Sequence, residues 1–300
     1  MGISSSEQST AERAAAEPML DQVLEWSAVN SGSRNLDGLK QMAGILANAF
    51  SDFPGDLKLV DPASVETVTA AGDRAALQHG QNLHLTVRPD APVQLLFTGH
   101  MDTVYGRDHP FQQTQWLEEG VLNGPGVADM KGGLAVMLAA LKAIEASDAV
   151  SSLGYEVIIN SDEEVGSLGS ASLIAKGAQG KLAALTYEPS ALPDGTLAGA
   201  RPGSGNFSFL IRGRSAHAGR NPEEGRNAIV AASELALRLA MSKTPGLTIN
   251  PAKIDGGGPN NVVPDLAILR VNMRPRTSDD QEIAGRLIAK AVEETARQHE

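Results

Sequence analysis

The stretch QLLFTGHMDTV, residues 94–104, changes character halfway along its length. Residues 95–97 are Leu-Leu-Phe, an unbroken apolar run that is typical of a buried strand over residues 94–98. Two residues with metal-ligating side chains, His100 and Asp102, follow directly. The stretch therefore predicts a strand that emerges from a core and delivers an imidazole and a carboxylate at its carboxyl end.

The segments around this strand alternate between strand and helix patterns. A helical pattern over Met19–Phe50 is interrupted at Asn30–Ser33, and a polar connection spans residues 105–125. The further expected elements are strands over 82–87, 155–160 and 182–187, and helices over 131–146 and 167–178. Strands that alternate with helices indicate an α/β domain with a largely parallel sheet.

The pattern changes after residue 201. The expected elements are a strand over 206–214, a helix with Asn221 as N-cap and Pro222 at its first position, strands over 247–255 and 266–274, and a last helix that starts with a Ser278–Gln281 capping box. This β-α-β-β-α order is a split βαβ unit without its final strand. We therefore expect one domain over residues 1–201 and an incomplete second domain over residues 202–300, with the rest of the first domain absent from the chain.

The composition limits the classes of protein that the chain can be. Hydrophobic residues make up 42% of the 300 residues, enough for a sizeable core, and the formal net charge of −11 argues against nucleic acid as a partner. The N-terminus lacks a secretory pattern, and no apolar run is long enough to cross a membrane. We expect a cytoplasmic protein. Because there is no cysteine, any metal site must use His, Asp and Glu.

Candidate ligands follow three of the expected strands. Glu163 and Glu164 come after the strand over 155–160, Glu188 comes after the strand over 182–187, and Asp129 precedes the helix over 131–146. The functional crevice of an open α/β sheet lies at the carboxyl ends of its strands, so these side chains and His100 are expected to converge. Carboxylates at close range repel one another, and a pair of divalent cations would relieve that repulsion.

The spacing also suggests roles within this cluster. Adjacent residues of an extended segment point to opposite sides, so one of Glu163 and Glu164 is expected to bind metal and the other to act as general base. Asp102 is placed to accept the second N–H of His100 and so to fix its tautomer.

Five motifs in this order, GHMDTV, NGPGVADMKGG, NSDEEVGS, YEPS and RGRSAHAG, resemble those of the M20 family of dinuclear zinc hydrolases. The resemblance covers about residues 90–280 and is greatest to the glutamate carboxypeptidase branch; acetylornithine deacetylase and succinyl-diaminopimelate desuccinylase are more distant. It implies an α/β fold with a phosphorylase/hydrolase-like zinc catalytic domain and an inserted ferredoxin-like α+β lid for dimerisation. The cofactor implied is two Zn²⁺ ions, with Co²⁺ or Mn²⁺ as other working ions.

The resemblance implies a role for each residue of the cluster. The metal ligands would be His100 and Glu188 for one zinc, Glu164 for the other, and Asp129 as the bridge between the two. Glu163 would activate the attacking water, and Asp102 would support His100. The peptide bond between Asp129 and Met130 would be cis.

The resemblance also implies roles for three residues of the second domain. His217 would reach the oxyanion of the scissile carbonyl across a homodimer formed through the lid. Asn261 and Arg274 would hold the substrate carboxylate or help to stabilise the oxyanion. The substrate would be a small peptide or an N-acyl amino acid.

The chain departs from the family at its C-terminal end. Members carry a last metal-binding histidine well beyond the lid, whereas the only later histidine here, His299, falls in the last expected helix. Either the chain is truncated or this form lacks a complete second metal site, and we expect truncation because the last expected helix has no return strand after it. We interpret His79, His84 and His109 as structural.

Two alternatives to a carboxypeptidase stay open at this stage. One is an N-acyl-amino-acid deacylase of the acetylornithine deacetylase or desuccinylase type with the same site. The other is a non-catalytic binding protein, or an inactive fragment, with the same fold.

Overall fold

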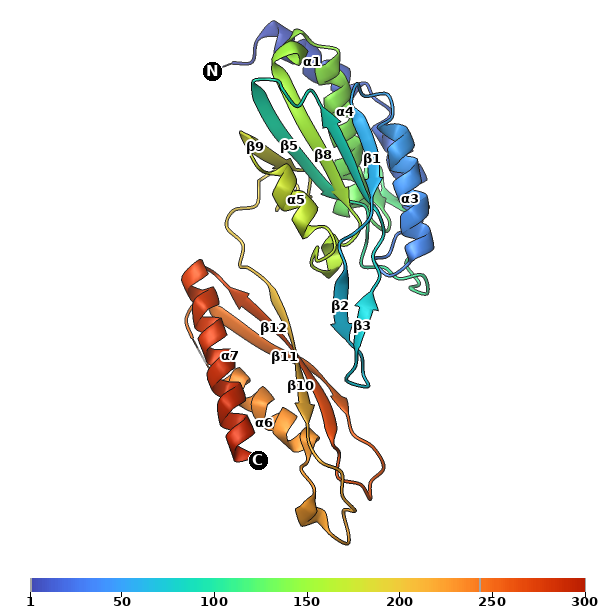
Figure 1. Cartoon of the computed structure of the whole chain (residues 1–300). Helices are drawn as coiled ribbons and strands as arrows, with labels where there is room; N and C mark the ends of the chain where they lie inside the picture. Colours follow the sequence, from blue (N-terminus) through green and yellow to red (C-terminus); the bar gives the residue numbers. More distant parts are fainter. Residues whose placement is uncertain (1, 243, 300) are drawn as a thin grey trace. The chain divides into compact units, whose positions relative to one another are not determined.

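The computed structural model describes residues 2–242 and 244–299 (Figure 1). The chain divides into two compact units, the first formed by Met1–Val65 and Leu77–Gly195 and the second by Glu66–Ala76 and Thr196–Glu300. Each unit has a hydrophobic core of its own. None of the described helices is long and apolar enough to cross a membrane.

The first unit is built on a five-stranded sheet. In spatial order its strands are β1 (Asp56–Val60), β4 (Asn82–Val87), β8 (Leu153–Asn160), β5 (Val93–His100) and β9 (Ala183–Thr186). Strand β5 runs parallel to both β8 and β9, whereas β4 pairs antiparallel with β8 and with β1. The prediction of a largely parallel sheet therefore holds for β8, β5 and β9 and is wrong for the other half.

Helices cover both faces of this sheet. The core face carries α2 (Met19–Ser27), α3 (Leu36–Ala49) and α4 (Gly132–Glu145), whose apolar side chains pack with those of β4, β5 and β8. The short helix α5 (Ala171–Gly177) packs on the other face, where Gly177 lies against Ile158. Helix α1 (Ser5–Ala15) begins with a capping box at Ser4 and contacts α4.

Two predicted irregular segments of the first unit have defined structure. The interruption at Asn30–Ser33 is confirmed, and there the chain forms a bridge between Gly32 and Thr103. The connection over residues 105–125 contains a hairpin of β6 (Gln115–Glu118) and β7 (Val121–Asn123), which the sequence did not predict. Short helical turns occur at η2 (Asp148–Ser152) and η3 (Glu163–Val165), and η1 (Val127–Lys131) is an irregular turn whose backbone is not helical at Asp129 and Met130.

The second unit is a three-stranded antiparallel sheet with two helices. Its sheet has the order β10 (Gly205–Arg212), β12 (Leu266–Pro275) and β11 (Leu247–Gly256), and α6 (Ala228–Met241) and α7 (Ser278–Gln298) pack with it around the second core. The predicted β-α-β-β-α order is confirmed. The hairpin of β2 (Val65–Val68) and β3 (Arg74–Leu77) also contacts this sheet, because Arg270 Nη2 donates to the Val68 carbonyl at 2.9 Å.

Both predicted helix starts in the second unit are displaced. Asn221 and Pro222 begin only a short 3-10 turn, η4 (Pro222–Glu224), and α6 starts later with Asn227 as its N-cap. The last helix has a capping box one residue earlier than predicted, formed by Thr277 and Asp280. In each place the chain offers two polar residues that can cap a helix, six residues apart before α6 and adjacent before α7, and the sequence pattern could not choose between them.

Candidate metal centre and active site

The sheet of the first unit brings its candidate ligands together at one edge. His100 is the last residue of β5 and lies beside Asn160, the last residue of the parallel strand β8. Glu163 and Glu164 follow Asn160 in turn η3, and Glu188 follows the parallel strand β9. Because all three strands point the same way, their carboxyl ends meet at a single edge.

Asp129 reaches the same edge from turn η1, directly before α4. The peptide bond between Asp129 and Met130 is cis, as the family resemblance implied. Gly133, in the first turn of α4, approaches the carbonyl of Tyr187 so closely that a Cβ atom at this position would lie 1.9 Å from the carbonyl oxygen. The absence of a side chain at Gly133 thus allows the segment that carries Asp129 to lie beside the one that carries Glu188.

His100 is the centre of the cluster. Its Nε2 lies 3.0 Å from Asp129 Oδ1, 3.4 Å from Glu188 Oε1 and 4.0 Å from Glu163 Oε2. Two overlapping triplets have all their ligand atoms within 4.8 Å of one another: His100, Glu163 and Glu188, and His100, Asp129 and Glu164. Four carboxylates and one imidazole therefore share one small volume.

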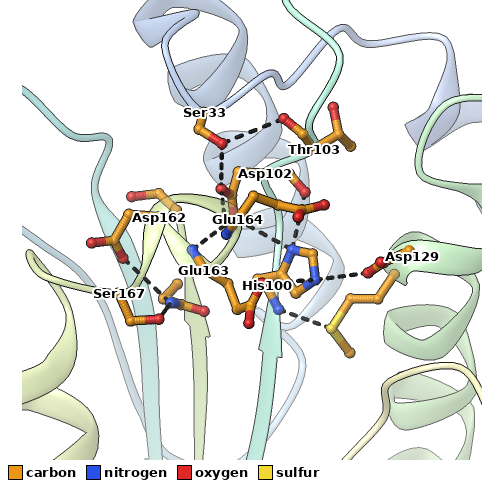
Figure 2. Close-up of polar contacts among 12 residues, drawn as sticks. Ser33, His100, Asp102, Thr103, Asp129, Asp162, Glu163, Glu164 and Ser167 are labelled. Atoms are coloured by element: carbon orange, nitrogen blue, oxygen red, sulfur yellow. Dashed lines mark hydrogen bonds and ion pairs between the residues drawn. The ribbon is translucent and has the colours of Figure 1, made fainter. Parts of the chain in front are cut away.

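Asp102 connects His100 to the turn that carries the two glutamates (Figure 2). Its Oδ1 lies 3.3 Å from His100 Nδ1, which also lies 3.0 Å from the Asp102 carbonyl oxygen. The same carboxylate accepts hydrogen bonds from the backbone N–H of Glu163 at 3.1 Å and of Glu164 at 3.2 Å. Asp102 is 1% exposed, so these bonds are shielded from water. One buried carboxylate thus orients both the imidazole and the glutamate turn.

The local geometry of Glu163 and Glu164 differs from the prediction. Their backbone forms the 3-10 turn η3 and is not extended, so the alternation of an extended segment cannot separate their side chains. The two side chains nevertheless fall into different triplets around His100. The reason given from the sequence is therefore wrong, while the separation itself is present.

Burial and the neighbouring charges raise the pKa values of three groups in the cluster. Burial and the nearby Asp129 carboxylate raise the pKa of Glu164 to about 7. Burial alone would lower the pKa of His100, but hydrogen bonds with Asp102 and Glu188 raise it to about 11. Burial also raises the pKa of Glu163, with Glu188 contributing in the same direction. Burial first and neighbouring carboxylates second thus raise the pKa values of the two glutamates, and carboxylate partners raise the pKa of His100.

The donor set fits divalent cations. Among the described residues, no lysine or arginine forms an ion pair with Asp102, Asp129, Glu163 or Glu164, and the buried Lys131 donates instead to the Val29 carbonyl at 3.0 Å. Imidazole and carboxylate ligands without thiolates suit zinc, cobalt or manganese. The residues of the two triplets could therefore hold such ions.

Two features of the site were missed by the sequence analysis. Ser33 Oγ donates to Asp102 Oδ2 at 2.7 Å, and the His100 backbone N–H contacts the sulfur of Met130 at 3.1 Å. The interruption at Asn30–Ser33 was the one available signal for Ser33, because a break in a helical pattern can mark a functional segment. Met130 gave no signal apart from its place beside Asp129.

The three candidate residues of the second unit lie on exposed positions. His217 forms a bridge with Val262, and the neighbouring Ala218 N–H donates to the Asn261 carbonyl at 2.9 Å, so His217 and Asn261 lie close together. This pair lies beyond the Leu266 end of β12, whereas Arg274 lies at the other end of that strand. The structure thus brings His217 and Asn261 together and places Arg274 apart from them.

Three of the four remaining histidines make polar contacts away from the cluster. His299 Nε2 lies 3.0 Å from Glu234 Oε2 within the second unit, and His84 Nε2 lies 2.6 Å from Glu156 Oε2 on the sheet of the first unit. His109 Nδ1 accepts from the Phe111 N–H at 3.1 Å. His79 is buried without a hydrogen-bond partner among the described residues.

The family model "Peptidase family M20/M25/M40" matches residues 96–299, which include every candidate residue. The chain belongs to this family.

Individual M20 relatives agree with this membership. Carboxypeptidase G2 from Pseudomonas sp. is 34% identical over 75% of the chain, and a succinyl-diaminopimelate desuccinylase from Maricaulis maris is 31% identical over 60% of it. The chain spans about half the length of these two relatives, 54% and 50%.

The fold is also shared with solved M20 structures. The Bacillus subtilis YXEP protein, described as a dinuclear metal binding peptidase of the M20 family, superposes with a TM-score of 0.58 at 12% identity. That alignment covers 97% of this chain and 72% of the YXEP chain. The expected fold class is thereby confirmed.

Proposed function

We propose that the protein is a zinc-dependent metallocarboxypeptidase that cleaves an amide or peptide bond next to a C-terminal amino acid such as glutamate. The observation that carries this proposal is the convergence of His100 with carboxylates from three other segments. The similarity to carboxypeptidase G2 supports a carboxypeptidase, and the choice of glutamate rests on the resemblance of the motifs to the glutamate carboxypeptidase branch. A further segment of the catalytic domain, with the last metal-binding histidine, would pack beside β9, which is exposed along its whole length.

The proposed metal ligands are those of the cluster. His100, Asp129 and Glu188 would hold one divalent cation, and Asp129 and Glu164 would hold a second. Zinc fits these donors, and cobalt or manganese are the alternatives. Bound cations would polarise the scissile carbonyl and lower the pKa of the attacking water.

Glu163 is the proposed general base. It would take a proton from the water that adds to the carbonyl carbon, and it would pass this proton to the amine nitrogen as the C–N bond breaks. Its side chain is 48% exposed and can meet a substrate, while its backbone N–H is fixed by Asp102. Asp102 would also keep His100 in the tautomer with a free Nε2 lone pair.

Three residues of the second unit would bind the substrate. His217 would donate to the oxyanion of the tetrahedral intermediate, and Asn261 beside it would help. Arg274 would bind the substrate carboxylate. Arg274 lies eight positions after Leu266 along β12, a span of about 26 Å, so one small substrate cannot meet both ends of the strand in one copy. We therefore propose a homodimer in which each site receives His217 and Asn261 from the partner copy.

A deacylase is the second candidate function. The desuccinylase relative, at 31% identity, favours it, because the same cluster would serve an N-acyl amino acid. Small N-acyl amino acids or peptides are the proposed substrates in either case. A cytoplasmic location remains a prediction from the sequence.

The test measures zinc per chain and the hydrolysis of an N-acyl-glutamate, N-acetylornithine and N-succinyl-diaminopimelate by the natural gene product. We expect the N-acyl-glutamate to be cleaved fastest, activity to disappear after dialysis against a chelator, and zinc to restore it. Preference for either of the other two substrates would support the deacylase. Zinc binding without any turnover would support the non-catalytic alternative.

A further inference from the structure

His79 is a buried histidine that the proposed mechanism leaves unused. It is 7% exposed, and neither of its ring nitrogens has a hydrogen-bond partner among the described residues. Buried polar groups are nearly always paired, so this ring calls for an explanation. Its Nδ1 lies 3.6 Å from Asp162 Oδ2, and both side chains are 1% exposed.

Asp162 is the centre of the turn that follows β8 (Figure 2). Its Oδ2 accepts from the Gly169 N–H at 2.6 Å, and its Oδ1 accepts from Ser170 Oγ at 2.6 Å and from Asn160 Nδ2 at 3.3 Å. Its carbonyl accepts from the Ser167 N–H at 2.7 Å. A single buried residue therefore connects the beginning of the turn to its end.

This turn carries Glu163 and Glu164, and two of its residues have positive φ angles. Gly166 has a φ of 98° and Ser167 a φ of 55°, a left-handed conformation that residues with a side chain seldom adopt. The amides of the two glutamates are held by Asp102, and the rest of the turn is held by Asp162. The positions of both glutamate side chains thus depend on a backbone that lies between two buried carboxylates.

The segment around His79 is fastened to the same turn by independent contacts. Ser161 Oγ donates to the Gly80 carbonyl at 2.7 Å. Gly169 packs so closely that a Cβ atom there would lie 3.0 Å from Pro62 Cβ and 3.4 Å from His79 Cδ2. The imidazole is therefore held in a fixed place beside Asp162.

We propose that His79 is a positioning residue, whose Nδ1–H faces the Asp162 carboxylate and thereby keeps the turn with Glu163 and Glu164 in its working conformation. Burial lowers the pKa of His79, so the ring is neutral and carries a single N–H. The adjacent carboxylate favours the tautomer with that hydrogen on Nδ1.

A role for His79 as a metal ligand does not fit the structure. The groups of three or more metal-type ligands among the described residues include neither His79 nor Asp162. The Asp162 oxygens already accept three hydrogen bonds from the turn, which a cation would have to displace. A positioning role uses the contacts as they are.

The catalytic part of this inference rests on the proposed hydrolase function. The test compares three variants of the full chain. His79→Leu keeps much of the volume and removes the donor, and His79→Asn returns a donor near the position of Nδ1. His84→Leu is the control, because it removes another partly buried histidine of the first unit that contacts Glu156 and not the turn.

Amide hydrogen exchange across residues 161–170 is the readout that does not depend on activity. We expect His79→Leu to speed exchange in this peptide about tenfold or more, with neighbouring peptides unchanged, because the turn opens locally. We also expect kcat to fall about 10- to 100-fold at nearly constant KM and bound zinc to weaken by a similar factor, as for other residues that support metal ligands. His79→Asn should restore most of both, and His84→Leu should change neither.

Three results would overturn the positioning role: unchanged exchange in His79→Leu, equal damage in His79→Asn, or the same exchange pattern in His84→Leu. If His79→Leu does not fold, His79→Gln replaces it, because its amide presents the donor near Nε2 instead of Nδ1 and should give the same local loss. If the wild type cleaves none of the substrates, the proposed function fails, while hydrogen exchange still decides the role of His79.

Discussion

The two units present their candidate residues in opposite ways. In the first unit His100 and Asp102 are each 1% exposed, and their partners arrive from several segments of the chain. In the second unit His217, Asn261 and Arg274 are exposed and stand at two ends of one strand. Carboxylates repel one another, so only a folded core can hold several of them close together. Polar groups that would bind a substrate can lie on the surface without such support. The cluster of the first unit thus rests on that unit's own contacts, whereas the placement of the second unit's residues at two ends of one strand is what the proposed homodimer would account for.

In the first unit, loss of the proposed general base Glu163 should have the largest effect on activity. Glu163→Gln keeps the shape and removes the proton acceptor, so we expect kcat to fall about 10²- to 10⁴-fold with zinc still bound. Turnover and zinc content per chain are the measurements. Glu164→Gln is the matched control and should lose zinc together with activity. A Glu163→Gln protein with near-normal turnover would remove Glu163 from the mechanism.

A mixture of two variants with low activity tests whether the residues of the second unit act across a homodimer. His217→Ala and Arg274→Ala should each lose about 10²-fold in kcat/KM, because each removes a charged or polar contact to the reacting substrate. When the two are unfolded and refolded together, mixed dimers contain one intact site, and the activity should return to about one quarter of the wild-type value.

The control for that mixture pairs two residues of the same end of the sheet. His217→Ala refolded with Asn261→Ala should regain nothing, because every site then lacks one of the two contacts. Regained activity in this control, or none in the first mixture, would contradict the division of the site between two copies.

A smaller effect is expected on the thermal stability of the metal-free protein when the pH is changed. The pKa of Glu164 is raised to about 7, so its neutral form stabilises the folded state below about pH 4.5 and this contribution is lost as the pH rises through 7. In chelator, Glu164→Gln should therefore melt about 2 °C or more above the wild type at pH 8, with little difference at pH 5.

With saturating zinc the order of the two proteins should reverse. Zinc must displace protons from His100 and Glu164, so its affinity for the wild type should rise between pH 5 and pH 8. The variant lacks one ligand and should gain less stability from zinc. Melting curves at pH 5 and pH 8, with zinc and with chelator, show whether the variant melts above or below the wild type in each condition. A variant that stays above the wild type in zinc would remove Glu164 from the ligand set.

The sequence predicted the position of a candidate residue correctly where the order of the strands alone determines that position. Parallel strands end at the same edge, so the places of His100, Glu163 and Glu188 along the chain were enough to predict that they meet. The supporting bonds were not predictable in this way, because Ser33 and Asp162 belong to residue types that are common in solvated loops. Backbone donors such as the Glu164 N–H have no signature in the sequence at all.

The second unit shows a related limit. The short strands β2 and β3 were not among the expected elements, and a strand pattern of period two would in any case not specify the sheet that they contact. Residues 66–76 therefore joined the second unit unexpectedly. Helix starts were ambiguous for a local reason, because a proline fits the first turn of both a 3-10 turn and an α-helix.

The smallest predicted effect separates two asparagines that the sequence could not distinguish. Asn227 Oδ1 accepts from the N–H groups of Ile229 and Val230 and caps α6, so Asn227→Ala should lower the free energy of unfolding by about 1 kcal/mol. Asn221 occupies the N-cap position of the three-residue turn η4 but makes no side-chain cap hydrogen bond, and Asn221→Ala should cost less than about 0.5 kcal/mol. Urea unfolding of both variants measures the difference. Both variants replace an asparagine of the second unit by alanine, so they differ only in the position of the lost side chain. Equal losses in the free energy of unfolding would therefore contradict the capping role of Asn227.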